Sequence, residues 1–247
     1  MGVVLATTSL WKGIFLSKQI EKLNVFMPVS AKFPDPAKIQ NTGQWYVLGH
    51  LSSGLSHFDH IKGRFEPLLA STESYTSGVH TFTLKDDITF HDGTPITTID
   101  VAASIKRLLV RKTSTHFPLW EYLEGCEDLK ALDDECSGLK VVSEKKIEIR
   151  LIKPLETFLL QMASPETGIW YHGDIDSKTL EIQPTKFSGP YWLNQLSADG
   201  FLLERNPANP ISQEFTQSPK SILIQTLSAS EAQAALIAGK IDLSIRS

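Results

Sequence analysis

A stretch from residue 79 to residue 111 constrains the fold of this chain more than any other part of its sequence. It begins with His80, Phe82 and Leu84 on one side of the backbone and with threonine and valine on the other side. This period of two is typical of a strand that buries one face. The alternation resumes briefly over residues 88–90. We therefore expect a strand that is followed closely by a second, shorter strand.

The rest of this stretch predicts a tight turn and then a helix. Gly93 adopts a positive φ at little cost, and Pro95 fixes its own φ and cannot extend a strand ladder. The helix is expected to begin near Thr97, because Asp100 completes a pattern close to a capping box. Apolar residues then recur at the spacing of a buried helical face, at Val101, Ile105, Leu108 and Leu109.

Three segments of this stretch resemble the signature of the family 5 extracellular solute-binding proteins. They are TFTL at 81–84, ITFHDGTP at 88–95 and DVAASIKRL at 100–108. Members of that family are the oligopeptide, dipeptide and nickel receptors of bacterial ABC importers. The resemblance implies an α+β fold, in which a periplasmic-binding-protein-like (type II) lobe with mixed β-sheets carries a smaller inserted α/β subdomain. An unrelated α+β domain with a chance FHDGTP turn is the alternative.

Shorter matches extend the resemblance over residues 23–245, with Asp35-Pro36 near the start. In the family, the chain continues into a second lobe and then returns to complete the first. By resemblance, residues 1–50 begin lobe I, residues 51–175 form the inserted subdomain, and residues 176–247 supply the remainder of lobe I. We therefore expect the second lobe to be missing, in a fragment or a truncated gene product.

The composition is that of a soluble globular protein, with 41% hydrophobic and 21% charged residues. A net charge of −4 argues against a nucleic-acid partner, because a phosphate backbone requires a clustered basic surface. No apolar run reaches the roughly 18 residues that span a bilayer. The N-terminal segment is a poor signal peptide, because it lacks an early positive charge. The resemblance alone implies a periplasmic or extracellular, membrane-associated location.

The two cysteines, Cys126 and Cys136, lie in one acidic segment. A pair that closes a short loop suits a disulfide bond in an oxidising compartment. A zinc site is disfavoured, because two thiols without further partners at ligand spacing do not complete one. Two unrelated free thiols are the remaining alternative.

The candidate ligand-binding residues come from the resemblance. In the family, two lobes close on a ligand about a hinge, and peptide ligands lie extended with their backbone paired to strands. The residues that would present backbone and small side chains to this cleft are Ser52, Ser53, Gly54 and Leu55. Phe117 stands where peptide-binding relatives place an aromatic residue near the ligand. The alternatives are a turn that needs Gly54 for its backbone and an ordinary packed phenylalanine.

Polar residues between positions 50 and 60 do not indicate a metal or catalytic site. His50, His57 and His60, even with Asp59, have neither the spacing of a helical pair nor that of a zinc finger. Ser56, His57 and Asp59 are the residue types of a hydrolase triad. Neighbours in one loop rarely supply the geometry of a triad, so a solvated or packing role is favoured.

The function that these features favour is binding of a peptide or similar solute, for delivery to the membrane subunits of an ABC transporter. The chain would be such a binding subunit or its N-terminal half, and surfaces left by the missing lobe would favour self-association. One alternative is the solute-sensing domain of a transcription regulator. A hydrolase that uses Ser56 or His91 is another, although Asp92 is expected to cap its own turn. We expect no catalysis, no cofactor and no metal, because no nucleophile elbow or phosphate loop is present.

Overall fold

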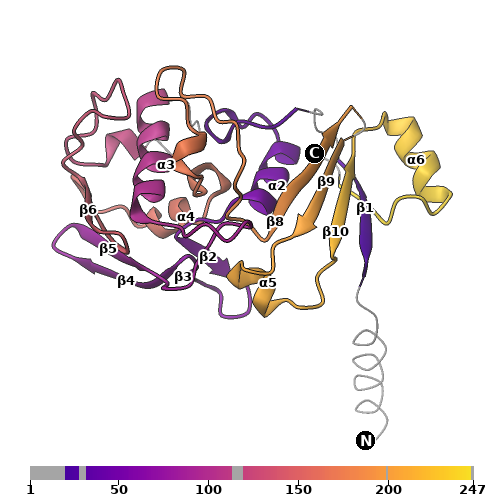
Figure 1. Cartoon of the computed structure of the whole chain (residues 1–247), viewed down its shortest axis with the longest axis horizontal. Helices are drawn as coiled ribbons and strands as arrows, with labels where there is room; N and C mark the ends of the chain where they lie inside the picture. The colour runs from indigo at the N-terminus through magenta and orange to yellow at the C-terminus, as the bar shows by residue number, and fades with distance from the viewer. Residues whose placement is uncertain (1–19, 28–31, 113–118, 199, 246–247) are drawn as a thin grey trace, which may run out of the picture.

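The computed structural model describes residues 20–27, 32–112, 119–198 and 200–245 (Figure 1). Their strands form one five-stranded, one four-stranded and one two-stranded sheet. Figure 1 shows the five-stranded sheet and the four-stranded sheet on opposite sides of the molecule. The α+β class with mixed sheets is therefore confirmed. None of the helices in these ranges is both long and apolar enough to cross a membrane.

The five-stranded sheet is mixed and has the order β11-β1-β10-β9-β8. Its strands are β1 (Lys22–Phe26), β8 (Tyr191–Ser197), β9 (Gly200–Arg205), β10 (Ser221–Gln225) and β11 (Leu243–Ser244). Strand β1 runs parallel to both β10 and β11, whereas the β10–β9 and β9–β8 pairs are antiparallel. Because β1 lies between two strands from the other end of the sequence, this sheet forms only when both ends of the chain meet.

Two helices, α2 (Thr42–Leu51) and α6 (Ala229–Ile237), cover opposite faces of this sheet. The cluster under α2 contains Val47, Leu48, Leu51, Phe201, Leu203 and Ile224. The smaller cluster under α6 contains Ala232, Phe26 and Ile241. Val25 and Phe26 are neighbours in β1 yet belong to different clusters, because successive side chains of a strand point to opposite faces.

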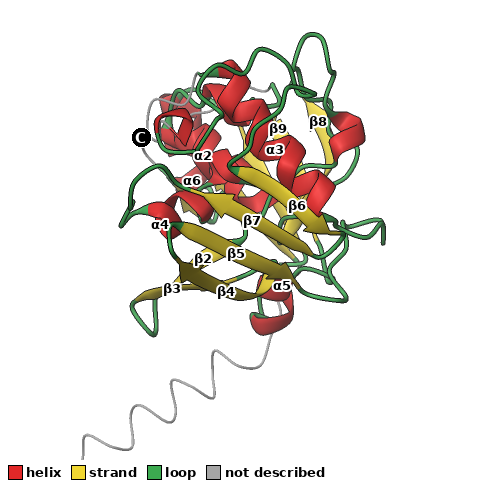
Figure 2. Cartoon of the chain, turned by 90° about the vertical axis from the view of Figure 1, so that its left-hand side faces the viewer, coloured by secondary structure: helices red, strands yellow, loops and turns green. Residues whose placement is uncertain are grey.

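The four-stranded sheet is antiparallel throughout and has the order β4-β5-β7-β6 (Figure 2). Its strands are β4 (Ala70–Thr76), β5 (Val79–Leu84), β6 (Leu139–Ser143) and β7 (Lys146–Arg150). Helix α3 (Thr98–Arg111) packs against it, and the shorter elements nearby are α4 (Phe158–Met162), β2 (Ser56–Asp59) and β3 (Arg64–Pro67). The alternation predicted for β5 is confirmed, since His80, Phe82 and Leu84 are all buried.

The hydrophobic interior is divided into two main clusters. The larger cluster contains buried residues between Leu55 and Ile169, and it lies between the four-stranded sheet and α3. The second cluster contains buried residues from the ranges 25–51 and 170–224, and it lies between α2 and the five-stranded sheet. The chain passes from one cluster to the other near Leu51 and again at Trp170.

The turn after β5 has the predicted positive φ, which is +86° at Gly93. The prediction of a short strand over residues 88–90 is wrong, because this segment makes only an isolated β-bridge, between Thr89 and Pro95. Proline has no backbone N–H, so the pairing cannot continue as a ladder. The Phe90 N–H still donates to the Thr94 carbonyl at 2.8 Å, which closes the turn.

Helix α3 begins with the predicted cap. The backbone N–H and the hydroxyl of Thr97 both donate to the Asp100 carboxylate, at 2.8 and 2.9 Å. Asp100 is itself buried and also accepts the backbone N–H of His172 at 3.0 Å. The predicted apolar face of α3 is confirmed, and its buried members are Val101, Ile105, Leu108 and Leu109.

Cys126 and Cys136 form the predicted disulfide bond, with their Cα atoms 4.7 Å apart. Both residues are buried and belong to the larger hydrophobic cluster. In the chain-entropy model, closing a loop of this size stabilises the fold by about 2 to 3 kcal/mol.

A buried ion pair fastens α3 to the loop that precedes α2. The guanidinium of Arg107 is 2% exposed and lies 2.6 Å from the Asp35 carboxylate. Its Nε also donates to the Leu180 carbonyl at 2.7 Å. Burial lowers the pKa of Arg107, and the Asp35 carboxylate opposes this effect. The same carboxylate accepts the Ala37 N–H at 2.9 Å, so Asp35 also orders the start of a 3-10 helix at Pro36–Lys38.

A second ion pair joins the turn after β5 to the segment that precedes β8. Lys186 Nζ lies 2.9 Å from the Asp92 carboxylate, which also accepts the Thr94 backbone N–H at 3.0 Å. Burial would raise the pKa of Asp92, but the hydrogen bonds from Lys186 and Thr94 outweigh it and lower that pKa to about 2.

We expect this carboxylate to make stability depend on acid pH. The folded-state pKa lies below the ordinary 3.8, so the stabilisation is present above about pH 4 and is lost as the pH falls through 2. Because the Asp92 side chain is 37% exposed, the effect should stay below about 1 kcal/mol. Melting curves should show Asp92→Asn less stable than wild type at about pH 5 and equal to it below about pH 2.

The exposed carboxylate Asp87 provides the control. The stability of Asp87→Asn should depend on acid pH in the same way as that of the wild type. A stability difference between Asp92→Asn and wild type that stays constant across the acid range would contradict the assignment.

Candidate functional site

Residues 52–55, the ligand contact expected from the sequence, lie in the interior at the junction of the two hydrophobic clusters. Ser53 uses all its polar groups there. Its N–H donates to the Ser188 hydroxyl at 3.1 Å, and its own hydroxyl accepts from the Asn209 amide at 2.9 Å. Its carbonyl accepts the Ile169 N–H at 2.9 Å. Each polar group of Ser53 therefore already has a partner within the chain, and the residue is only 4% exposed.

Gly54 and Leu55 are equally enclosed. A Cβ atom on Gly54 would lie 2.0 Å from the Met162 carbonyl oxygen, which is backbone and cannot move aside cheaply. The Leu55 carbonyl accepts the Leu68 N–H at 2.8 Å. The expectation that Ser52, Ser53, Gly54 and Leu55 present an edge to a ligand therefore needs correction, because the chain itself covers all four. Phe117, the other expected ligand contact, lies outside the described residues.

The serine, histidine and aspartate candidates for catalysis do not assemble. The Ser56 hydroxyl donates to the Leu159 carbonyl at 2.8 Å, and Asp59 accepts the backbone N–H groups of Ile61 and Lys62. Both groups therefore serve local structure. Within the described ranges, no three His, Cys, Asp or Glu side chains are grouped so that they could hold a metal ion.

His91 and Asp92 also point to different partners. The His91 ring stacks on Trp192, with ring centroids 4.8 Å apart, and its Nδ1 accepts the Phe187 N–H at 3.3 Å. Asp92 caps its own turn, as the sequence predicts, and pairs with Lys186. The pair therefore joins two loops and has no acid–base geometry.

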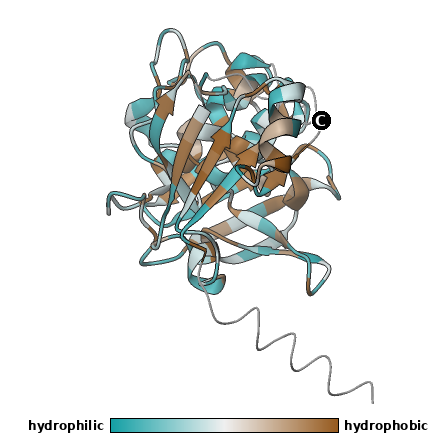
Figure 3. Ribbon diagram, turned by 90° about the vertical axis from the view of Figure 1, so that its right-hand side faces the viewer, coloured by the Kyte–Doolittle hydropathy of each residue, from teal (hydrophilic) through white to brown (hydrophobic). Residues whose placement is uncertain are grey.

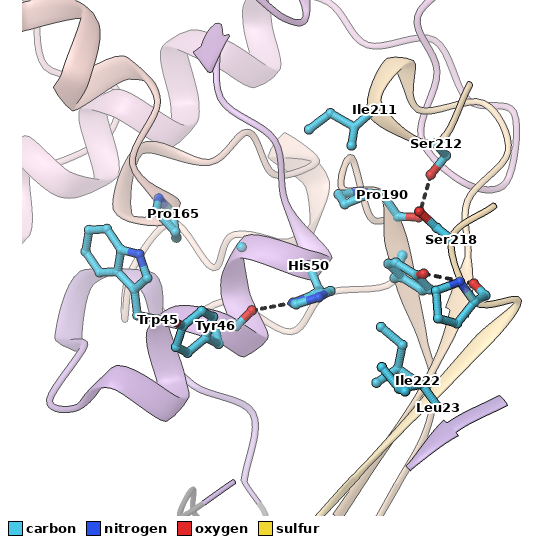
Figure 4. A pocket seen from close by; sticks show the side chains of 13 residues that line it. Leu23, Trp45, Tyr46, His50, Pro165, Pro190, Ile211, Ser212, Ser218 and Ile222 are labelled. Atoms are coloured by element: carbon cyan, nitrogen blue, oxygen red, sulfur yellow. Dashed lines mark hydrogen bonds between the residues drawn. The ribbon is translucent and has the colours of Figure 1, made fainter. Parts of the chain in front are cut away.

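The surface beside α2 is hollowed by two adjoining cavities. The first, which we call the loop pocket, has a volume of about 590 Å³ and is lined by Ile39, Gln40, Asn41, Thr42, Trp45 and Tyr46. The second, which we call the sheet pocket, has a volume of about 480 Å³ and lies between α2 and strands β1, β8 and β10 (Figure 4). Trp45 and Tyr46 line both cavities.

The loop pocket is built on extended backbone between two capped helices. Ile39 has φ −63° and ψ 124°, and Asn41 has φ −154° and ψ 164°. Asn41 accepts the Gln44 N–H at 3.0 Å as the cap of α2, and the Gln44 side chain accepts the Gln40 N–H at 2.8 Å. Gln40, Asn41 and Thr42 are exposed, so this ordered, extended segment borders solvent.

The sheet pocket has aromatic and proline walls. His50 and Tyr191 face each other with ring centroids 5.6 Å apart, and Pro165, Pro190 and Pro219 also line the cavity. His50 Nδ1 donates to the Tyr46 carbonyl at 2.7 Å. Burial lowers the pKa of His50, which favours the neutral ring and leaves Nε2 as an acceptor.

Sequence analysis did not single out Trp45 and Tyr46. The buried face of α2 consists of Val47, Leu48 and Leu51, and Tyr46 falls off that face and is 42% exposed. The sequence did carry a signal for this site. It was an aromatic residue, Tyr46, on the solvent side of a helix that begins after an Asn cap.

The fold described above is that of a lobe of a type II periplasmic binding protein, and it is shared by solved structures of this class. The unliganded open form of the murein tripeptide-binding protein MppA is similar with a TM-score of 0.74 and 23% identity, over 92% of this chain and 45% of that chain. Listeria monocytogenes OppA bound to peptide is similar with a TM-score of 0.76 and 19% identity, over 91% of this chain and 46% of that chain.

The chain belongs to the bacterial extracellular solute-binding proteins, family 5, since the model of the family's middle region matches residues 64–247. The periplasmic murein peptide-binding protein MppA of Escherichia coli (strain K12) is 32% identical over 131 residues, which are 51% of this chain and 24% of MppA. The periplasmic oligopeptide-binding protein OppA of the same strain is 27% identical over 145 residues, 54% of this chain and 26% of OppA. The aligned segments thus cover about a quarter of these curated relatives, and in the structural comparison the chain covers 45% of MppA.

Proposed function

We propose that this chain is the peptide-binding part of a solute-binding subunit that serves an ABC importer outside the cytoplasmic membrane. Its membership of family 5 carries the proposal, and the relatives named above are periplasmic peptide-binding proteins. The regulator and hydrolase alternatives gain no support, because these relatives are binding proteins and Ser56 is engaged with the Leu159 carbonyl. The partners would be a peptide and the membrane subunits of the importer.

The loop pocket is the contact that we propose for the peptide. Extended peptides are commonly recognised by pairing their backbone with an exposed, extended segment. Residues 39–41 supply such a segment, and the two hydrogen bonds that join Gln40 and Asn41 to Gln44 fix its conformation before a ligand arrives. Trp45 and Tyr46 supply apolar surface beside it.

The domain division stays a proposal with the same bounds, 1–50, 51–175 and 176–247. The two hydrophobic clusters support a division near these positions, because the chain crosses between them near residues 51 and 170.

We expect the chain alone to bind free peptides no more tightly than about 1 mM. One lobe contacts one side of the ligand, and each net hydrogen bond contributes only about 0.5 to 1.5 kcal/mol. Association must also offset roughly 4 to 15 kcal/mol of lost translational and rotational freedom. Calorimetric and NMR titrations with di- to pentapeptides measure this affinity. The absence of any peptide response at about ten times that concentration would contradict peptide binding, and micromolar binding by a monomer would contradict the single-lobe interpretation.

Self-association through α6 and β11 is also proposed. Strand β11 is an edge of the five-stranded sheet, and beside it Leu236, Ile237 and Leu243 are 46%, 81% and 46% exposed. Figure 3 shows this side of the molecule, with hydrophobic strands beside α6. Exposed apolar surface next to an unpaired strand edge favours association between copies.

We expect Ile237→Lys to reduce this association, because a charge on the contact would lose its water. Sedimentation velocity over rising protein concentration measures it. Ile61→Lys is the control, since Ile61 is 87% exposed but lies between β2 and β3. A wild-type chain that stays monomeric at the highest attainable concentration, or equal effects of both variants, would contradict the proposed surface.

A further inference from the structure

The sheet pocket adjoins the proposed peptide contact, because Trp45 and Tyr46 line both cavities. When the backbone of a peptide pairs with residues 39–41, one of its side chains can therefore reach the sheet pocket. Successive side chains of an extended peptide point to opposite sides, so one side chain can enter a cavity while its neighbours stay in solvent. The chemistry of the sheet pocket then selects that side chain.

The lining of the sheet pocket is aromatic and uncharged. It contains no Asp, Glu, Lys or Arg among the residues that the structure describes. A buried ionised side chain is costly unless an opposite charge pairs with it. The pocket therefore disfavours both acidic and basic peptide residues. Trp45, Tyr46 and Tyr191 offer ring surfaces, against which another aromatic ring packs favourably.

Two of the hydroxyl donors that line this pocket are already used within the chain. The Tyr191 hydroxyl donates to the Pro219 carbonyl at 2.8 Å, and the Ser212 hydroxyl donates to the Pro190 carbonyl at 2.9 Å. The Ser218 hydroxyl can act either way. These groups favour an occupant that donates a hydrogen bond.

His50 supplies the strongest of these acceptors. Its Nδ1–H donates to the Tyr46 carbonyl, so in the neutral ring Nε2 carries the lone pair. In the part of the chain that the structure describes, Nε2 has no hydrogen-bond partner. Tyr46 thus fixes both the orientation of the ring and its tautomer.

From this lining we propose that the sheet pocket is a specificity pocket for one side chain of the bound peptide, which is neutral and aromatic and carries a hydrogen-bond donor. Tyrosine has these properties, and its hydroxyl donates to His50 Nε2. The inference rests on the proposed peptide-binding function. It adds to that function the class of side chain that the site prefers.

The test is an NMR titration of the full chain with three tetrapeptides that differ at one position, which is tyrosine, phenylalanine or O-methyltyrosine. The Trp45 indole signal, assigned with Trp45→Phe, reports binding. We expect the tyrosine peptide to bind about fivefold more tightly than either analogue, the size of one hydrogen bond. His50→Phe keeps a ring in the pocket but removes the acceptor, so it should abolish the difference in affinity between the tyrosine and phenylalanine peptides.

His60→Phe is the matched control, because His60 is exposed on the β2–β3 turn and should leave the preference intact. If His50→Phe does not fold, Gly49→Leu provides a second test, since a side chain from this exposed position would occupy the cavity and should also remove the preference. Equal binding of all three peptides to the wild type would overturn the specificity pocket alone. No response to any peptide would overturn the proposed function with it.

Discussion

Arg107→Leu is expected to lower the free energy of unfolding by about 3 kcal/mol. The substitution removes the nearest ion-pair partner of the Asp35 carboxylate, 2.6 Å away in the native chain, and the shorter of the two hydrogen bonds that the Leu180 carbonyl accepts. Removing one partner of a buried ion pair costs about 3 to 5 kcal/mol, and the lower end applies here because the Asp35 side chain keeps 22% of its exposure. Urea denaturation measures the loss.

Arg111→Leu is the matched control for this prediction. Arg111 lies one helical turn later, donates to the same Leu180 carbonyl at 3.1 Å and is 4.0 Å from the Asp35 carboxylate. Its side chain is 11% exposed, and its contact with the carboxylate is longer, so we expect it to cost less than half as much. If the two variants lower the free energy of unfolding equally, the Arg107–Asp35 contact contributes no more to stability than the longer Arg111–Asp35 contact.

Gly54→Ala is expected to destabilise the fold by about 3 kcal/mol, at the upper end of the usual cost of overpacking. The added methyl group would lie 2.0 Å from the Met162 carbonyl oxygen, so either the segment at 52–55 or the end of α4 must move. Any such shift would disturb the hydrogen bonds of Ser53 as well.

Gly49→Ala tests the same change where there is room for it. The nearest atom to a new Cβ at Gly49 is a Pro165 ring carbon at 3.5 Å, an ordinary contact, and the residue is helical. Alanine should therefore stabilise α2 by about 0.5 to 1 kcal/mol. If thermal melts show Gly54→Ala within experimental error of wild type, the packing at this junction is looser than the structure indicates.

Features that depend on neighbouring residues could be predicted from the sequence. The alternation of β5, the positive φ of Gly93 and the cap of α3 by Asp100 are all decided within a few residues. The disulfide is also local, because Cys126 and Cys136 are ten positions apart.

The fate of residues 52–55 could not be predicted, because their burial depends on distant partners. Ser188 and Asn209, which satisfy Ser53, lie 135 and 156 positions later in the chain. Serines and a glycine near a helix end are equally compatible with a solvent-facing edge and with a packed junction. Similarly, the exposure of Tyr46 beside the loop pocket depends on which face of α2 packs against the five-stranded sheet, whose strands come from distant parts of the sequence.

The junction around Ser53 has a mechanical consequence. A hinge needs a few residues that can absorb a change in φ and ψ without losing contacts. Here Ser53 is tied to both Ile169 and Ser188, and Gly54 is wedged against Met162. Bending at this point would break several buried hydrogen bonds at once. We therefore expect the two sheets to move together as one rigid body rather than to bend at this junction.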